Sequence, residues 1–360
     1  MSFSIASMQQ LIFVYPGDLN ARTGGYAYDR RIIEGLKNLG WQIQLISLGP
    51  GYPFPSPIQV AQAAEKLLKL PIGIPMVIDG LALGALPALA AQIAQRHPLI
   101  ALIHHPLAFE AGLSDAQINH LKQSEIEALR YVSKAIANSL ATARHLYVHY
   151  GLAQSRIEVV LPGTDRISHT YPKEKHSASN SNPIRLLSVG SIIPRKGFHY
   201  LIEALAPLAG SNWTLSIAGE TSRHAKAYAQ LLADIQRFHL TNQVHVLGAV
   251  SDQELQTLYE QADVFVLASL FEGYGMVYAE AMAYGLPIIA TTGGAIPDTV
   301  PTEAGLLVAP GDVPALTLAL KTLIEDQAYR ARLASGALLA AAQQPSWALA
   351  IQQFASAITR

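Results

Sequence analysis

Short apolar runs alternate with amphipathic stretches along almost the whole chain. The apolar run at residues 11–15 predicts a buried strand, and residues 26–39 carry apolar side chains at helical spacing up to the stop signal Gly40. The same alternation predicts strands over residues 42–48, 76–79, 99–104, 135–138 and 157–161, and helices over residues 86–95, 118–132 and 140–149. Strands that alternate with helices are typical of a parallel sheet covered by helices on both faces.

The pattern restarts after a polar segment. Residues 169–183 are rich in Ser and Asn and almost free of aliphatic side chains, which predicts a linker. Beyond it, strands are expected over residues 185–189, 214–218, 244–247, 263–268 and 287–291, and helices over residues 198–208, 225–238, 252–261, 276–284 and, in the tail, 347–357. We therefore expect an N-terminal domain (1–168), a linker (169–183), a C-terminal domain (184–344) and a C-terminal helical segment (345–360).

Composition excludes several classes of protein. Of the 360 residues 50% are apolar and 14% charged, against about 25% charged in an average globular domain, which excludes intrinsic disorder. The formal net charge of −1 argues against a nucleic-acid partner, which would need a basic face. The chain has no cysteine, so disulfides, thiolate catalysis and iron–sulfur clusters are excluded.

The apolar composition calls for a test of membrane insertion. The richest apolar region, residues 70–113, is interrupted by Asp79, Arg96 and the His104-His105-Pro106 triplet, so no run reaches the ~20 residues that span a bilayer. The first ten residues lack the basic start of a signal peptide. We therefore expect a cytoplasmic protein, compatible with peripheral contact at the inner face of a membrane.

A glycine pair follows the first predicted strand. Gly24 and Gly25 precede a helix, and their missing Cβ atoms let the backbone come close to a phosphate or a sugar. The spacing does not match G-x-G-x-x-G, which counts against a dinucleotide site. An ordinary loop glycine pair is the alternative interpretation.

Two adjacent cations follow the first strand of the second domain. Arg195 offers a planar fork and Lys196 a point charge, and together at a strand end they can hold a diphosphate. A solvated basic turn would explain the same residues.

The segment 270–287 combines a glycine-rich loop, a helix and two glutamates. Glu272 precedes the helix and Glu280 lies within it, and carboxylates are good acceptors for sugar hydroxyls. An anion could bind the backbone N–H groups that are unsatisfied at the start of this helix, namely those of Gly275, Met276 and Val277.

This stretch, from Glu272 to Pro287, resembles the signature of glycosyltransferase family 4, retaining sugar-nucleotide enzymes with the GT-B fold. The Gly24-Gly25 loop, the His104-His105-Pro106 strand end and the segment 190–197 resemble family landmarks in the right order. The resemblance implies two doubly wound Rossmann-like domains facing a cleft, with a C-terminal helix that returns to the first domain. It also implies no permanently bound cofactor and no metal, in keeping with the lack of an Asp-x-Asp motif.

The resemblance assigns roles by position in the second domain. Glu272 would bind hydroxyls of the transferred sugar, and Glu280 the ribose hydroxyls of the donor. Arg195 and Lys196 would hold the diphosphate together with the glycine-rich loop at Gly273, Gly275, Met276 and Val277, and the region of Val250 would pack against the base.

In the first domain, the resemblance implies that Gly24 and Gly25 close over the phosphate and that His105 lies near the sugar. His105 as a hydrogen-bonded core histidine is the alternative. His104 is expected to be structural, because strand alternation points it away from its neighbour. Many family members carry an Arg where this chain has Ser191, which leaves open whether Arg195 takes over its role.

The activity implied is retaining transfer of a sugar from a nucleoside diphosphate sugar, a UDP- or GDP-sugar, to a glycan, lipid or small-molecule acceptor. A sugar-nucleotide epimerase, which needs no acceptor, and a non-catalytic sugar-nucleotide-binding protein are the alternatives.

Overall fold

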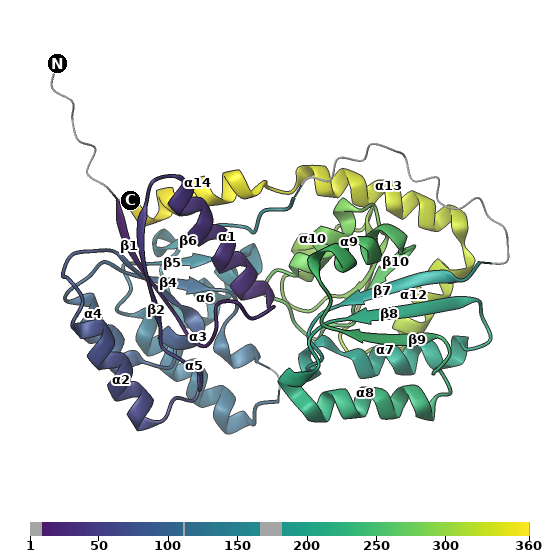
Figure 1. The fold of residues 1–360 in the computed structure, drawn as a ribbon, viewed down its shortest axis with the longest axis horizontal. Coiled ribbons are helices and arrows are strands. Elements are labelled where there is room, and N and C mark those ends of the chain that lie inside the picture. Colours follow the sequence, from purple (N-terminus) through teal and green to yellow (C-terminus); the bar gives the residue numbers. More distant parts are fainter. Residues whose placement is uncertain (1–8, 111, 166–181, 360) are drawn as a thin grey trace, which may run out of the picture. The chain divides into compact units, whose positions relative to one another are not determined.

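The computed structural model describes residues 9–110, 112–165 and 182–359 and divides into two compact units (Figure 1). One unit comprises Met1–Gly163 and Trp347–Arg360, and the other comprises Thr164–Ser346. The predicted linker, residues 169–183, lies almost wholly outside the described residues.

The first unit is built on a six-stranded parallel sheet with the strand order β2-β1-β3-β4-β5-β6. Its strands are β1 (Gln10–Tyr15), β2 (Gln42–Ser47), β3 (Met76–Asp79), β4 (Leu99–Ile103), β5 (Lys134–Ala137) and β6 (Ile157–Val159). Its helices are α1 (Gly24–Asn38), α2 (Pro57–Leu68), α3 (Gly80–Leu83), α4 (Pro87–Ala94), α5 (Asp115–Leu129), α6 (Leu140–Tyr150) and α14 (Trp347–Thr359). The central strands β3 and β4 are buried along their whole length, as expected of a parallel sheet covered on both faces.

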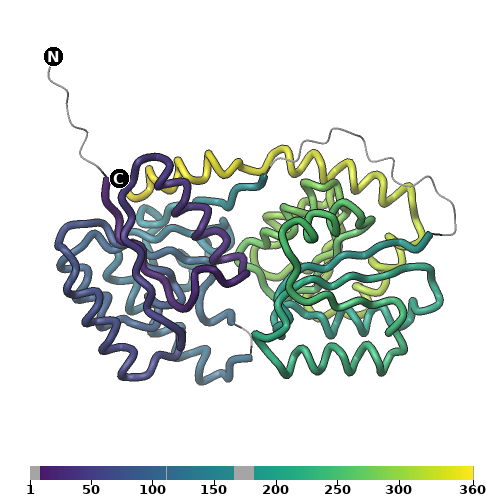
Figure 2. The backbone as a smooth tube through the Cα atoms, viewed as in Figure 1, coloured from purple at the N-terminus to yellow at the C-terminus, as the bar shows by residue number. Residues whose placement is uncertain are grey.

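The C-terminal helix α14 packs on α1, as Figure 2 shows in yellow and purple. A Cβ atom on Gly35 would lie 2.1 Å from the side chain of Ile351, so any other residue there would force that side chain to move. The ring centroid of Tyr28 lies 6.0 Å from that of Trp347 and 6.5 Å from that of Phe354. The predicted return of the C-terminal helix to the first domain is confirmed.

The second unit repeats the architecture with the strand order β12-β11-β10-β7-β8-β9, again all parallel. Its strands are β7 (Ile184–Val189), β8 (Trp213–Ala218), β9 (Val244–Gly248), β10 (Val264–Val266), β11 (Ile288–Thr291) and β12 (Gly305–Val308). Its helices are α7 (Phe198–Leu205), α8 (Ala225–Arg237), α9 (Asp252–Gln261), α10 (Met276–Ala283), α11 (Ile296–Thr299), α12 (Val313–Glu325) and α13 (Gln327–Gln343). Two doubly wound sheets are thus present, as the sequence predicts.

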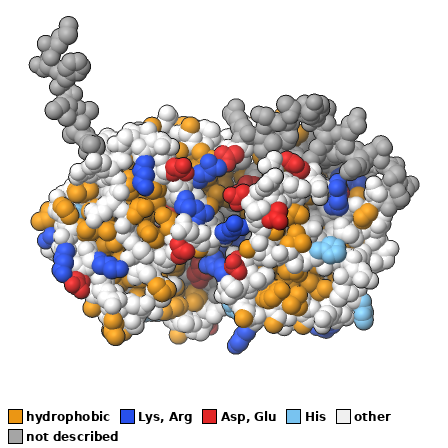
Figure 3. Space-filling view, viewed as in Figure 1, with side chains coloured by type: hydrophobic (Ala, Val, Ile, Leu, Met, Phe, Trp, Pro, Cys, Tyr) orange, Lys and Arg blue, Asp and Glu red, His pale blue; other side chains and the backbone are white. Residues whose placement is uncertain are grey.

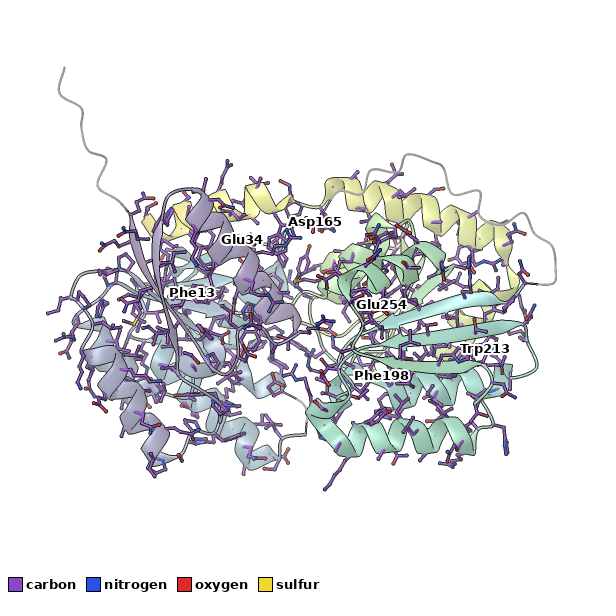
Figure 4. The ribbon with its side chains drawn as sticks, viewed as in Figure 1. Phe13, Glu34, Asp165, Phe198, Trp213 and Glu254 are labelled. Carbon is purple, nitrogen blue, oxygen red and sulfur yellow. The ribbon has the colours of Figure 1, made fainter. Side chains whose placement is uncertain are left out.

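Each unit has its own apolar core. Phe13 is fully buried in the first unit, and Phe198 and Trp213 are buried in the second (Figure 4). The buried indole of Trp213 donates its Nε1–H to the Leu208 carbonyl at 2.7 Å, which satisfies its polar atom inside the core.

Apolar side chains are also exposed at several places on the face shown in Figure 3. Phe54 and Ile58 are exposed side chains of the first unit. Among the helices of the described residues, none has the length and apolar character needed to cross a bilayer.

Glu125 is a buried carboxyl in the first unit. It lies on α5 with no exposed surface, and its Oε2 accepts a hydrogen bond from the Leu107 amide at 2.9 Å. Burial raises the pKa of Glu125 to about 8, although the Leu107 amide acts in the opposite direction. Leu107 begins the turn that follows β4, so Glu125 ties α5 to the loop after that strand.

We expect Glu125 to make the protein less stable as the pH rises from about 5 to about 8. In this window the folded state holds a proton that the unfolded carboxyl, with its ordinary pKa near 4.5, has released. The free energy of unfolding should fall by up to about 1.4 kcal/mol per pH unit from this group. Urea unfolding at pH 5.5, 7 and 8 checks this: Glu125→Gln should gain stability relative to the wild type as the pH rises.

Glu127→Gln provides the control, because Glu127 is an exposed carboxyl on the same helix. The free energy of unfolding of this variant should depend on pH as that of the wild type does. A Glu125→Gln variant whose stability follows the wild type in parallel from pH 5.5 to 8 would contradict the assignment.

Candidate functional site

The order of strands in the second sheet determines where its functional side chains meet. Sequential connections run outward from β7 to β8 and β9 on one side and through β10, β11 and β12 on the other. The carboxyl ends of the neighbours β7 and β10 are therefore where loops diverge and where ligands bind in such sheets. Arg195 and Lys196 follow β7, and Glu272 follows β10.

Gly197 allows the segment after β7 to approach the segment after β10. Residues Pro194–Lys196 form a turn of 3-10 helix that ends at Gly197, which has φ +66°. A Cβ atom there would lie 2.0 Å from the carbonyl oxygen of Ala268. The Leu270 amide donates to the Arg195 carbonyl at 2.7 Å, so the two segments are joined through their backbones as well.

One carboxylate pairs with both cations. Lys196 Nζ lies 2.6 Å from Glu272 Oε1, and Arg195 Nη1 lies 3.1 Å from Glu272 Oε2. Ser269 donates its hydroxyl to Glu272 Oε1 at 2.6 Å. We call Arg195, Lys196, Ser269 and Glu272 the ion cluster. The structure brings together three of the predicted site residues here.

The ion cluster keeps Glu272 ionised. The side chain of Glu272 is only 7% exposed, and burial opposes ionisation, but the charges of Lys196 and Arg195 outweigh it and lower the pKa of Glu272 to about 2. Burial also lowers the pKa of Lys196, and the Glu272 charge opposes that shift. Glu272 can therefore accept hydrogen bonds at neutral pH but has no proton to donate.

The loop after β11 fixes the backbone of Glu272. The Ala295 amide donates to the Glu272 carbonyl at 2.9 Å. A Cβ atom on Gly293 would lie 2.3 Å from the Leu270 carbonyl oxygen, and one on Gly294 would lie 2.3 Å from the Glu272 carbonyl oxygen. Sequence reasoning gave Gly293 and Gly294 no role, although an adjacent glycine pair after a strand is the signal that could have found one.

The helix α10 begins beside the ion cluster. Gly275 precedes it with φ +86°, and no side chain caps the helix start. Its first backbone N–H groups are therefore suited to an anionic ligand. Of the other predicted residues in this loop, three are half-buried, namely Gly273, Met276 and Val277.

Glu280 and Val250 both belong to the second unit. Glu280 lies on α10, half-buried, and its Oε2 accepts a hydrogen bond from the Tyr259 hydroxyl at 3.0 Å. Val250 is half-buried and precedes Ser251, the N-cap of α9. Since Val250 follows β9 and Glu280 follows β10, both come after the carboxyl end of a parallel strand, as a ligand-binding residue in this fold should.

In the first unit, one of the two predicted glycines lies beside His104. Gly24 and Gly25 begin α1, which Thr23 caps by accepting a hydrogen bond from the Tyr26 amide. A Cβ atom on Gly25 would lie 3.3 Å from the ring of His104, whereas Gly24 has open space around it. His105 instead lies 2.6 Å, Nε2 to Oε1, from Glu110.

His104 belongs to a buried polar cluster that sequence reasoning missed. Its Nε2 donates to Asp29 Oδ1 at 3.0 Å and lies 3.7 Å from Asp79 Oδ2. Burial disfavours the imidazolium, but the charges of Asp29 and Asp79 outweigh it and raise the pKa of His104 to about 9. Asp29 comes from α1 and Asp79 from the end of β3, and their spacing in the sequence gave no signal of this contact.

The positions of Asp29, Asp79 and His104 also allow a metal ion in principle, since one potential ligand atom of each lies within 4.8 Å of the others. A metal would require the lone pair of His104 Nε2, where the structure has a hydrogen bond to Asp29. The cluster is therefore better described as an ion pair than as a metal site.

Gly197→Ala should destabilise the second unit, because the substitution combines a left-handed backbone with the close Ala268 carbonyl. We expect the free energy of unfolding to fall by about 2–4 kcal/mol. Gly210→Ala is the control, since a Cβ atom on Gly210 would meet no neighbouring atom within 4 Å. This substitution should change the free energy of unfolding by less than about 1 kcal/mol. Denaturant unfolding of both variants checks this, and equal stabilities would contradict the packing argument.

A sequence profile of the family described as glycosyl transferases group 1 matches residues 172–338. The matched range contains Arg195, Lys196, Glu272 and Glu280.

Curated relatives are similar over more than half of the chain. The MMP alpha-(1->4)-mannosyltransferase of Mycolicibacterium hassiacum is 26% identical over 265 residues, which is 69% of this chain and 62% of the relative. The glycogen synthase of Mycobacterium tuberculosis is 27% identical over 259 residues, which is 70% of this chain and 60% of the relative. The chain thus spans about three fifths of the length of these relatives.

Solved structures match nearly the whole chain. Sucrose-phosphate synthase from Thermosynechococcus elongatus superposes with a TM-score of 0.79 at 21% identity, over 97% of this chain and 98% of that one. Anabaena HepE in complex with UDP and glucose superposes with a TM-score of 0.73 at 21% identity, over 96% and 99% of the two chains. These likenesses show the fold, and the GT-B fold expected from the resemblance is confirmed.

Proposed function

We propose that the chain is a member of the family of group 1 glycosyl transferases, whose profile matches residues 172–338, and that it transfers a sugar from a nucleoside diphosphate sugar to an acceptor hydroxyl with retention of anomeric configuration. The observation that carries the proposal is the ion cluster, in which one ionised carboxylate holds two cations beside the uncapped start of α10. Cations and free amides suit a diphosphate, and a carboxylate suits the hydroxyls of a sugar.

Arg195 and Lys196 are the residues to which we assign the diphosphate. As the bond from the anomeric carbon to the diphosphate oxygen breaks, negative charge develops on that oxygen. Preorganised cations aimed at this charge stabilise the transition state, and such stabilisation is usually the largest single contribution to the rate. The acceptor oxygen then forms the new bond on the same face, and the departing diphosphate takes the acceptor's proton.

Glu272 acts in this scheme as an acceptor for sugar hydroxyls. Its low pKa keeps it ionised at neutral pH, so it positions the sugar and does not serve as a general acid. Glu280 is assigned to the ribose and Val250 to the base. The roles of Gly24, Gly25 and His105 stay predictions that rest on the resemblance alone.

The donor we propose is a UDP- or GDP-sugar, with no metal and no permanently bound cofactor. The HepE structure holds UDP and glucose, and the M. hassiacum relative is named as a mannosyltransferase. A glycan, a lipid or a small molecule is the proposed acceptor.

Donor binding is tested by thermal unfolding with UDP-, GDP-, ADP- and dTDP-sugars. A donor present at one hundred times its Kd should stabilise the folded state by about 2.7 kcal/mol and raise Tm accordingly. We expect the largest shift with a UDP- or GDP-sugar. The absence of a shift with every nucleotide sugar would overturn the proposal.

The fate of the bound donor separates transfer from epimerisation. The protein is incubated with the stabilising donor, with and without a panel of glycan, lipid and small-molecule acceptors, and the nucleotide sugar is analysed. We expect the donor sugar to keep its configuration and the nucleoside diphosphate to be released in the presence of an acceptor. An epimerised nucleotide sugar formed without an acceptor would identify an epimerase instead.

Lys196→Ala should lower turnover at saturating donor by roughly 100-fold or more, the usual loss when a group that stabilises developing charge is removed. Lys321→Ala is the control, because Lys321 is exposed on α12 of the same unit. The turnover of both variants is measured as the initial rate of nucleoside diphosphate release, and circular dichroism verifies that they are folded. Near-normal turnover by folded Lys196→Ala would contradict the assignment of the diphosphate to the ion cluster.

A further inference from the structure

Tyr259 links two helices of the second unit at the side chain assigned to the ribose. It lies near the end of α9, only 2% exposed, and its hydroxyl donates to Oε2 of Glu280 on α10 at 3.0 Å. Sequence reasoning gave Tyr259 no role, because its position in the chain does not reveal this contact.

Aromatic packing fixes the direction of this hydroxyl. The ring of Tyr259 stacks on that of Tyr284 with a centroid distance of 5.0 Å and an angle of 8° between the planes. It also stacks on the ring of Phe265, with a centroid distance of 6.2 Å and an angle of 27° between the planes. The hydroxyl of Tyr259 is therefore held rigidly relative to α10, which bears Glu280.

The hydroxyl of Tyr259 is not required for packing. Phenylalanine would fill the same aromatic stack without placing a polar atom in a buried position, where an unpaired hydroxyl is costly. Burial and the charge of Glu280 raise the pKa of Tyr259 well above its ordinary value, so the phenol keeps its proton and remains a donor. Tyr259 can therefore donate its hydroxyl to Glu280 at neutral pH.

We propose that Tyr259 is a positioning residue that orients the Glu280 carboxylate toward a ribose diol and thereby makes nucleotide binding selective for ribose over deoxyribose. This inference rests on the proposed function, since it takes Glu280 to be the ribose ligand. The Tyr259 hydroxyl occupies one acceptor position of the Glu280 carboxylate. Fixing one oxygen also restricts rotation of the carboxylate, which reduces the conformational entropy lost when a diol binds.

Tyr259→Phe tests the inference because it removes one hydroxyl and keeps the ring. Calorimetric titration is done with UDP or GDP, whichever binds the wild type more tightly, and with its 2′-deoxy and 3′-deoxy counterparts. We expect the wild type to prefer the ribonucleotide by roughly tenfold or more, as for a hydrogen bond to a charged group. The variant should lose roughly threefold or more of that preference, within the range for coupled neighbours, and its affinity for the deoxynucleotides should change less than about twofold.

Two further variants sharpen the test. Tyr228→Phe removes the hydroxyl of a half-buried tyrosine on α8 of the same unit and should keep the wild-type preference for ribose. Glu280→Gln should abolish the preference, and adding Tyr259→Phe to it should cause no further loss. With the sugar donor, Tyr259→Phe should raise KM and leave kcat nearly unchanged.

An unchanged ratio of ribonucleotide to deoxynucleotide affinity in folded Tyr259→Phe would overturn the role of Tyr259 and leave the proposed function intact. An equal loss of affinity for both nucleotides would do the same, because it would show a purely structural effect. A wild-type protein that binds none of these nucleotides would overturn this inference together with the proposed function.

Discussion

A single carboxylate holds two cations together in the second unit, and the rest of the candidate site depends on this pairing. Without Glu272, the side chains of Arg195 and Lys196 would lie close together with like charges and little access to water. Removal of one partner from such a buried group is costly, because the remaining charges are left uncompensated. With Glu272 in place, the ion cluster still holds one more positive than negative charge, so it can receive an anion.

The glycines around the ion cluster follow from the same constraint. The three segments after β7, β10 and β11 can meet only if their backbones nearly touch. Gly197 lies against Ala268, and Gly294 lies against the carbonyl of Glu272. Side chains at these glycines would separate the segments and lengthen the ionic contacts. Gly197 and Gly294 therefore keep the charged side chains at ion-pair distance as well as allowing the backbones to pack.

The alternation of apolar and amphipathic segments predicted both parallel sheets, because strands buried on both faces leave a clear apolar run. Other elements escaped it for physical reasons. The helix α2 begins with Pro57 after a loop rich in Gly and Pro, which hides it. The alanine-rich helix α13 shows no clear apolar stripe.

The resemblance supplied the identities of the candidate residues, but not their contacts. Lys196 and Glu272 are 76 positions apart, and spacing alone cannot show that they form an ion pair. Strand alternation led to the expectation that His104 is structural, whereas its ion pair with Asp29 depends on how α1 packs against β4.

The C-terminal helix gives the first unit an unusual dependence on the order of synthesis. Tyr28 lies on α1, which is translated before the second unit, yet two of the aromatic rings around it, Trp347 and Phe354, are translated after that unit. While the second unit is translated, the face of α1 that packs on α14 is therefore still exposed to solvent. A premature stop codon shortly before residue 347 would leave the second unit complete but would remove α14 from the first unit and so destabilise it.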